Sequence, residues 1–257
     1  MLKHCVLSVD YSESWEKTLD HLPATVRLLG LNRLTLVHVI ETHKRQHIED
    51  SEGVIEGRLK KLAEQLSAEL NLTVDYRLRK GFAASELLDA ARKVEANLVI
   101  ALNRSHSSGR ELFRGNIALN LARMTRIPLL ILPMDSKVAE PDGAIMLATD
   151  GSTASQKAEK CFRSFMDGGN LGLVVWVDEG EADASGMLEA LSSEYGSLSV
   201  QRLSGSPGKE IVEAARQEDV TLLILGKRGA TPINELPLGS VAEHVCRESH
   251  NPVLLIP

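Results

Sequence analysis

The sequence predicts an α/β protein with two domains in tandem, each built around a doubly wound, parallel sheet of five strands. Short unbroken apolar runs, such as Leu-Val-Ile-Ala-Leu at residues 98–102, are typical of parallel strands buried on both faces. These runs alternate with helical segments along the chain, which is the pattern of doubly wound α/β domains. The same succession occurs twice, so we expect two copies of one unit.

In the first copy, the apolar runs predict strands at residues 4–9, 34–40, 73–78, 97–102 and 128–132. Helices are expected between them at residues 14–29, 48–70, 84–94 and 116–125, the second of which is long and polar.

In the second copy, strands are expected at residues 144–149, 171–177, 198–203, 221–225 and 253–256. The helices between them are expected at residues 154–166, 182–194, 209–217 and 240–248, and the second of these is short.

An internal repeat supports this division. Identical residues recur 124 positions apart, in the pairs Gly81 and Gly205, Glu86 and Glu210, Gly115 and Gly239, and Pro128 and Pro252. The register has no gap between residues 81–133 and 205–257, whereas Asp10 and Asp150 are 140 positions apart. The second copy therefore lacks 16 residues, which we place after its second strand. A shared offset over such a length indicates duplication.

The repeat sets the expected domain boundaries. The first domain should cover residues 1–135 and the second residues 142–257, joined by a linker at residues 134–143 that contains Pro141 and Gly143.

Composition excludes several classes of protein. With 257 residues, 43% of them hydrophobic and 25% charged, the chain has the composition of a soluble globular protein. No apolar stretch approaches the roughly 20 residues that span a bilayer, and no leader precedes the first strand, so we expect a cytoplasmic protein without membrane contact. The net charge of −6 and the lack of a clustered basic face argue against nucleic acid as a partner. Three scattered cysteines show no metal-ligand spacing, and no metal site is predicted.

A glycine pattern near the C-terminus is the strongest functional signal. After the predicted strand 221–225 come Gly226 and Gly229, then nine residues, then Gly239 and Ser240 at the start of a helix. Glycines leave backbone amides uncovered, and a helix N-terminus attracts anions, so this loop predicts a phosphate-binding site. The alternatives are an ordinary strand-to-loop turn and, for Ser240, a helix N-cap.

A second cluster should lie beside this loop. Ligands of open parallel sheets bind beyond the carboxyl ends of the strands, where the strand order reverses. Thr149 and Asp150 end the first strand of the second copy, and the glycine loop ends the fourth, so topology brings them together. Asp150 is either a ligand contact or a helix cap, and Lys227 and Arg228 are either phosphate contacts or solvated loop charges.

The G-x2-G-x9-G-S spacing, the strand before it and the final strand resemble those of the ATP-binding universal stress proteins. The resemblance covers the whole chain and implies two tandem universal stress protein domains with a Rossmann-like fold of the adenine nucleotide alpha hydrolase type. It also implies that Asp150 lies beside the adenosine, that Val177 touches the adenine, and that Leu225 and Val241 line the pocket.

The implied function is a stress-response regulator that signals by nucleotide occupancy. The ligand would be ATP or AMP, with Mg²⁺ bound through the phosphates, and the protein partner that reads occupancy is unidentified. No pair of groups suited to activating water is evident, so no catalytic residue is assigned. The alternatives are a slow ATPase and an interaction module that binds no nucleotide; the HIGH, KMSKS and SGGxDS motifs of related synthetases and pyrophosphatases are absent.

The first copy departs from the pattern. Leu102 and Ser105 replace the first two glycines and Asn116 replaces the serine, while Asp10 and Gly115 remain. We expect a scaffold that binds no nucleotide, since Leu102 would fill the space that a phosphate needs. The alternative is a weak site formed by Arg104, His106, Arg110 and Asn116.

The final strand of each domain should be an apolar sheet edge that needs cover. Residues 128–132 and 253–256 are expected to face each other, which would make the chain an intramolecular pseudo-dimer. Association of two chains into a homodimer is left open.

Overall fold

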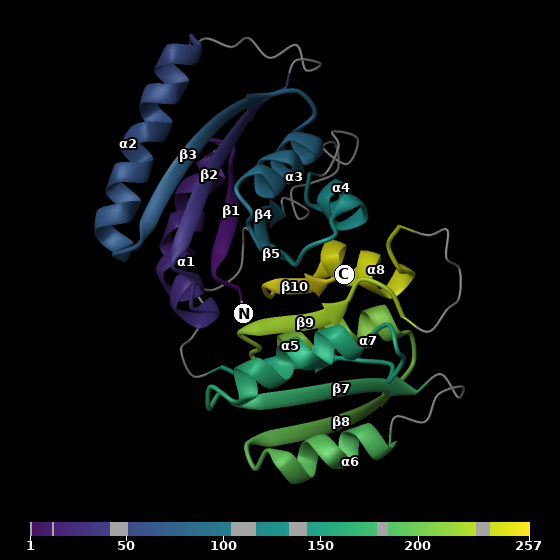
Figure 1. Ribbon diagram of the computed structural model, residues 1–257. Coiled ribbons are helices and arrows are strands. Elements are labelled where there is room, and N and C mark those ends of the chain that lie inside the picture. Colours follow the sequence, from purple (N-terminus) through teal and green to yellow (C-terminus); the bar gives the residue numbers. More distant parts are fainter. Residues whose placement is uncertain are drawn as a thin grey trace. The chain divides into compact units, whose positions relative to one another are not determined.

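The computed structural model describes residues 2–11, 13–41, 51–103, 117–133, 143–178, 185–229 and 237–257. These residues form two compact units, Leu2–Leu102 and Asn103–Pro257 (Figure 1). Of the predicted linker at residues 134–143, all but Gly143 lies outside the described residues.

The first unit contains a parallel sheet. Its strands are β1 (His4–Val9), β2 (Arg33–Ile40), β3 (Thr73–Lys80) and β4 (Leu98–Asn103), in the spatial order β3-β2-β1-β4. Every described pairing among them is parallel. The helices are α1 (Glu13–Leu29), α2 (Glu52–Leu70) and α3 (Ala83–Lys93).

Apolar patterning explains these elements. β1 and β4 are buried along most of their length, as expected for central strands with helices on both faces. The polar helix α2 buries a single stripe made of Ile55, Leu59, Ala63 and Leu66, which recur about once per turn. It ends at Asn71, whose φ of 52° is the left-handed conformation that stops a helix.

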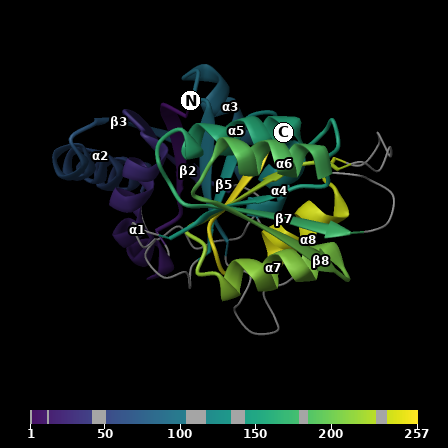
Figure 2. The ribbon, with the colours of Figure 1, turned by 90° about the horizontal axis from the view of Figure 1, so that it is seen from below.

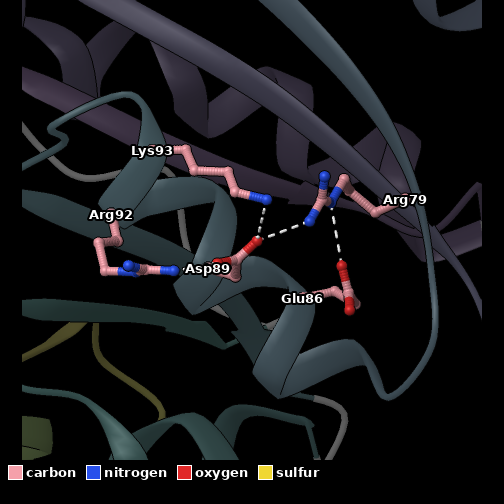
Figure 3. A network of polar contacts seen from close by, with 5 residues as sticks. All are labelled: Arg79, Glu86, Asp89, Arg92 and Lys93. Atoms are coloured by element: carbon pink, nitrogen blue, oxygen red, sulfur yellow. Dashed lines mark hydrogen bonds and ion pairs between the residues drawn. The ribbon is translucent and has the colours of Figure 1, made fainter.

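Ion pairs attach α3 to β3 in the first unit (Figure 3). Arg79 on β3 contacts the carboxylates of Glu86 and Asp89 at 3.0 and 2.6 Å. Asp89 also pairs with Arg92 and Lys93, and hydrogen bonds from Lys93 and Arg92 lower its pKa to about 2. In the second copy, Glu213 and Arg216 form a pair that matches Asp89 and Arg92, so this one ion pair of the cluster recurs on the corresponding helix.

The second unit contains the larger sheet. Its strands are β5 (Leu129–Pro133), β6 (Ile145–Ala148), β7 (Gly172–Asp178), β8 (Leu198–Ser204), β9 (Leu222–Gly226) and β10 (Val253–Ile256), in the order β5-β10-β9-β6-β7-β8. The helices are α4 (Ile117–Met124), α5 (Gln156–Met166), α6 (Ser185–Glu194), α7 (Pro207–Gln217) and α8 (Ser240–Glu248).

This sheet is doubly wound. Figure 2 shows α5 and α6 on one face of β7 and β8, and α7 and α8 on the opposite face. The chain runs outward from β6 to β8 and then returns to β9 on the other side of β6, so the strand order reverses between β6 and β9.

The last strands of the two copies pair with each other. β5 and β10 run antiparallel, with Leu130 opposite Leu254, and both side chains are buried. This is the pairing expected from the sequence, and it covers two apolar edges that would otherwise promote association.

Hydrogen bonds from Lys227 and Asn103 run in both directions between the two copies and support this pairing. The Lys227 ammonium donates to the carbonyls of Arg123 and Thr125 at the end of α4, at 2.8 and 2.9 Å. Asn103, which is 124 positions before Lys227, donates from its amide to the carbonyl of Cys246 in α8 at 2.9 Å. Asn103 at the end of β4 thus bonds the last helix of the second copy, α8, and Lys227 after β9 bonds the end of the last helix of the first copy, α4.

The predicted α/β fold class is confirmed, and most elements lie within a few residues of their predicted positions. β3 continues to Lys80, two residues further than predicted. α5 begins at Gln156 and not at residue 154, because the Ser155 amide and hydroxyl both donate to the Ser152 carbonyl in a preceding turn.

We predict that the β5–β10 pairing holds the two copies together after the chain is cut. Residues 1–138 and 139–257, expressed as separate chains, should co-purify. Leu254→Asp should abolish co-purification, because it buries a carboxylate in the paired strands at a cost of several kcal/mol. Leu171→Asp, at a position 54% exposed, is the matched control and should leave the complex intact. Halves that elute separately on size exclusion would contradict the prediction.

Candidate functional site

The candidate site lies at the carboxyl ends of β6 and β9. These strands are neighbours, with Ala148 opposite Leu225, and they flank the point where the strand order reverses. In doubly wound sheets this is the usual position of a ligand crevice. Thr149 and Asp150 follow β6, and the glycine loop begins at the last residue of β9.

The two predicted clusters meet at Asp150 and Gly229. A Cβ atom on Gly229 would lie only 2.6 Å from Asp150 Oδ2. A Cβ atom does not approach an oxygen so closely, so any side chain at position 229 would have to displace the Asp150 carboxylate. Asp150 Oδ1 accepts the Ser152 amide at 3.0 Å, which fixes the carboxylate against the loop. Topology thus brings together residues that are far apart in the sequence.

The turn after β6 is held by Thr149, whose side chain is buried. Its hydroxyl donates to Ser155 Oγ at 3.1 Å and accepts the Gly151 amide at 3.2 Å. Gly151 has a φ of 70°, in the left-handed region that favours glycine. Thr149 therefore fixes the turn that positions Asp150, and its hydroxyl is already engaged in these two hydrogen bonds.

The glycine loop closes onto the start of α8. The Gly239 amide donates to the Lys227 carbonyl at 3.0 Å, and a Cβ on Gly226 would lie 3.0 Å from the Arg228 carbonyl. Gly239 occupies the N-cap of α8 and has no side chain that could accept hydrogen bonds from the first amides of the helix. The Gly239 carbonyl accepts the Glu243 amide, which is the first hydrogen bond of the helix. The amides of Ser240 and Val241 come before it and therefore have no carbonyl acceptor within the helix.

The side chain of Lys227 is directed to α4. It is 8% exposed, its ammonium has the two carbonyl partners described above, and its backbone amide donates to the Ile256 carbonyl at 2.7 Å. Burial lowers its pKa, and the nearby charges of Arg228 and Arg126 lower it further. A cation at the end of α4 also interacts favourably with the helix dipole. Arg228, by contrast, is exposed.

The predicted apolar contacts lie at the same end of the sheet. Val177 is the penultimate residue of β7, Leu225 that of β9, and Val241 lies in the first turn of α8. Val177 and Leu225 are buried, and Val241 is partly exposed. The structure thus places the three residues on three elements whose ends surround Asp150 and the glycine loop.

The first copy differs at a position that the sequence comparison did not single out. Tyr11 is 140 positions before Gly151 and shares its left-handed conformation, with a φ of 51°. Its ring lies 5.1 Å from that of His38, between ring centroids, and within the described residues its buried hydroxyl has no hydrogen-bond partner. Burial raises the pKa of Tyr11 to about 12, although Arg58 opposes this shift. A bulky side chain therefore replaces a glycine beside Asp10.

Ser105, Gly115 and Asn116 lie outside the described residues, as do the alternative site residues Arg104, His106 and Arg110. Across the part of the chain that the structure describes, no three or more His, Cys, Asp or Glu residues group as metal ligands. No helix in that part is both long and apolar enough to cross a membrane.

Comparison with known proteins identifies the family. The model of the universal stress protein family matches residues 1–133 and 169–257, which is most of the chain, so the protein belongs to this family. A universal stress protein of Mycolicibacterium smegmatis is 25% identical over 266 aligned residues, covering 93% of this chain and 86% of that protein. Universal stress protein MJ0577 of Methanocaldococcus jannaschii is 44% identical over 52 residues, covering 20% of this chain and 32% of its own length.

Solved structures support the fold. A universal stress protein from Archaeoglobus fulgidus has a TM-score of 0.80 at 22% identity, covering 100% of this chain and 96% of that one. A protein from Pseudomonas aeruginosa, described as functionally unknown, has a TM-score of 0.73 at 15% identity, with coverage of 99% and 92%. Residues 134–168, which include Asp150, fall outside the family match, so the placement of Asp150 rests on its contact with Gly229.

We predict that Lys227→Met lowers the free energy of unfolding and has little effect on nucleotide affinity. The free energy of unfolding should fall by about 1–3 kcal/mol, because the carbonyls of Arg123 and Thr125 lose their donor. Denaturant titration measures this loss, with Lys209→Met as the control at an exposed lysine. Unchanged stability together with a tenfold loss of ATP affinity would instead make Lys227 a phosphate ligand.

Proposed function

We propose that this universal stress protein binds an adenine nucleotide, ATP or AMP, in the crevice of its second copy and regulates a stress response through occupancy. The observation that carries the proposal is the close approach of Asp150 to Gly229, beside the N-terminus of α8, whose N-cap is a glycine. The contact makes one site of two separate sequence clusters, and the helix end supplies donors suited to phosphate.

Each part of the site has a chemical role in this proposal. The amides of Gly229, Ser240 and Val241 face the phosphates, and Arg228 adds an exposed positive charge. Asp150 accepts hydrogen bonds from the adenosine, and Val177, Leu225 and Val241 provide the apolar surface for the base. Mg²⁺ would be held through the phosphates, since the described residues offer no cluster of metal ligands. Gly226 and Gly239 allow the backbone to approach the nucleotide closely.

The arrangement favours binding over catalysis. Activation of water needs a general base placed opposite the leaving phosphate. Asp150 is fixed by Ser152 and directed to Gly229, and the Lys227 ammonium is occupied by carbonyls of α4. We therefore propose a nucleotide-binding regulator that hydrolyses ATP slowly at most, and whose occupied form is recognised by a protein partner.

We predict that Gly239→Asp removes ATP binding without unfolding the protein. A Cβ at Gly239 would meet backbone atoms at 3.4 Å or more, and Asp is a favourable N-cap, so the fold should tolerate the change. Its carboxylate would repel phosphate at the start of α8, and ATP affinity by calorimetry should fall at least ~10-fold.

Gly186→Asp is the matched control for this experiment. Gly186 lies in the first turn of another helix, α6, and a Cβ there would meet nothing within 4 Å. The control should bind ATP as the unmodified protein does. If the unmodified protein itself gives no heat with magnesium-ATP, the interaction-module alternative replaces our proposal.

We predict that one chain binds one nucleotide. Tyr11 and Leu102 occupy positions where the second copy has glycines, so the first copy should stay empty at ligand concentrations that saturate the second. Native mass spectrometry with ATP should show one added nucleotide per chain. Two added nucleotides, both lost only when Asp10 and Asp150 are replaced together, would show that the first copy also binds.

A further inference from the structure

We propose that Arg126, which belongs to the first copy, contacts the outer phosphates of the nucleotide bound by the second copy. The site would then be completed by both copies. This inference rests on the proposed function and adds a residue that determines phosphate selectivity. Its basis is a rigid turn that is fixed to the glycine loop and presents an arginine to solvent.

The turn that carries Arg126 is held by its own hydrogen bonds. It follows α4, and the Thr125 hydroxyl donates to the Ile127 carbonyl at 2.6 Å and accepts the Ile127 amide at 3.2 Å. The Thr125 amide continues the helical bonding to the Leu121 carbonyl at 2.7 Å. Thr125 is buried, whereas Arg126 at the tip of the turn is exposed.

The same turn is fixed to the nucleotide loop. The Lys227 ammonium bonds the Thr125 carbonyl, one residue before Arg126, at 2.9 Å. Lys227 lies between Gly226 and Gly229, and its carbonyl accepts the Gly239 amide at 3.0 Å. A short chain of hydrogen bonds therefore connects the backbone beside Arg126 to the start of α8, which packs against α4 (Figure 1).

The local charge favours an anion. Arg126 and Arg228 both lie near enough to Lys227 to lower its pKa, an effect second to that of burial. The nearby carboxylate of Glu243 is already paired with Arg123 at 2.7 Å and with Arg247 at 2.9 Å. Within the described residues, no ion pair joins Arg126 or Arg228 to a carboxylate.

Like charges held this close repel one another, and a multiply charged phosphate would relieve the repulsion. Arginine also binds phosphate oxygens through two parallel hydrogen bonds. The contribution of Arg126 should therefore increase with the number of phosphates on the ligand. It should be large for ATP, smaller for AMP and absent for adenosine.

The test compares three ligands with two charge-neutralising variants by calorimetry. Arg126→Gln should raise the Kd for ATP about 5- to 20-fold, which corresponds to one charge-assisted contact of about 1–2 kcal/mol. The Kd for adenosine should not change. Arg77→Gln, an exposed arginine on β3, is the matched control and should bind all three ligands normally. Arg126→Lys should keep part of the ATP affinity.

The outcomes separate this inference from the proposed function. An unmodified protein that binds no nucleotide rejects both. ATP binding that is equal in Arg126→Gln and Arg77→Gln rejects the inference and leaves the proposed function standing. An equal loss for ATP and adenosine in Arg126→Gln, at an unchanged melting temperature, also rejects it, because a phosphate contact cannot act on adenosine.

Discussion

The hydrogen bonds of the buried Lys227 ammonium are the interaction on which the arrangement around the candidate site depends. Lys227 stands in the glycine loop of the second copy and satisfies carbonyls at the end of α4, which belongs to the first. A helix end with unpaired carbonyls and a lysine without an acceptor would both be costly in this buried setting. By satisfying each other, they fix the loop, the α4 turn and the β5–β10 strand pair with respect to one another.

The fold was largely accessible from the sequence, for identifiable reasons. Short unbroken apolar runs such as residues 222–225 predict buried strands. Because the sequence is repeated, each strand could be assigned independently in both copies. The convergence of Asp150 with the glycine loop also followed from sequence, since parallel topology dictates which strand ends are neighbours. These predictions used patterns that depend only on local order and connectivity.

The sequence did not predict which of two adjacent polar side chains is buried and which is exposed. Lys227 and Arg228 are adjacent and look equivalent in the sequence, yet one is buried against α4 and the other is exposed. Only the pairing of β5 with β10 brings the α4 carbonyls within reach of Lys227, so no local signal could separate the two. Tyr11 was overlooked for a related reason: its alignment with Gly151 matters only once both residues are seen in the left-handed conformation.

That shared conformation also bears on the history of the chain. A tyrosine in the left-handed region is strained. The backbone of the first copy nevertheless has the same conformation at Tyr11 as the second copy has at Gly151, whichever of the two residues came first. The turn after the first strand is thus set by the surrounding architecture and not by the residue that occupies it. Duplication left two copies of one backbone scaffold, in which the residue at this turn differs while the backbone conformation is the same.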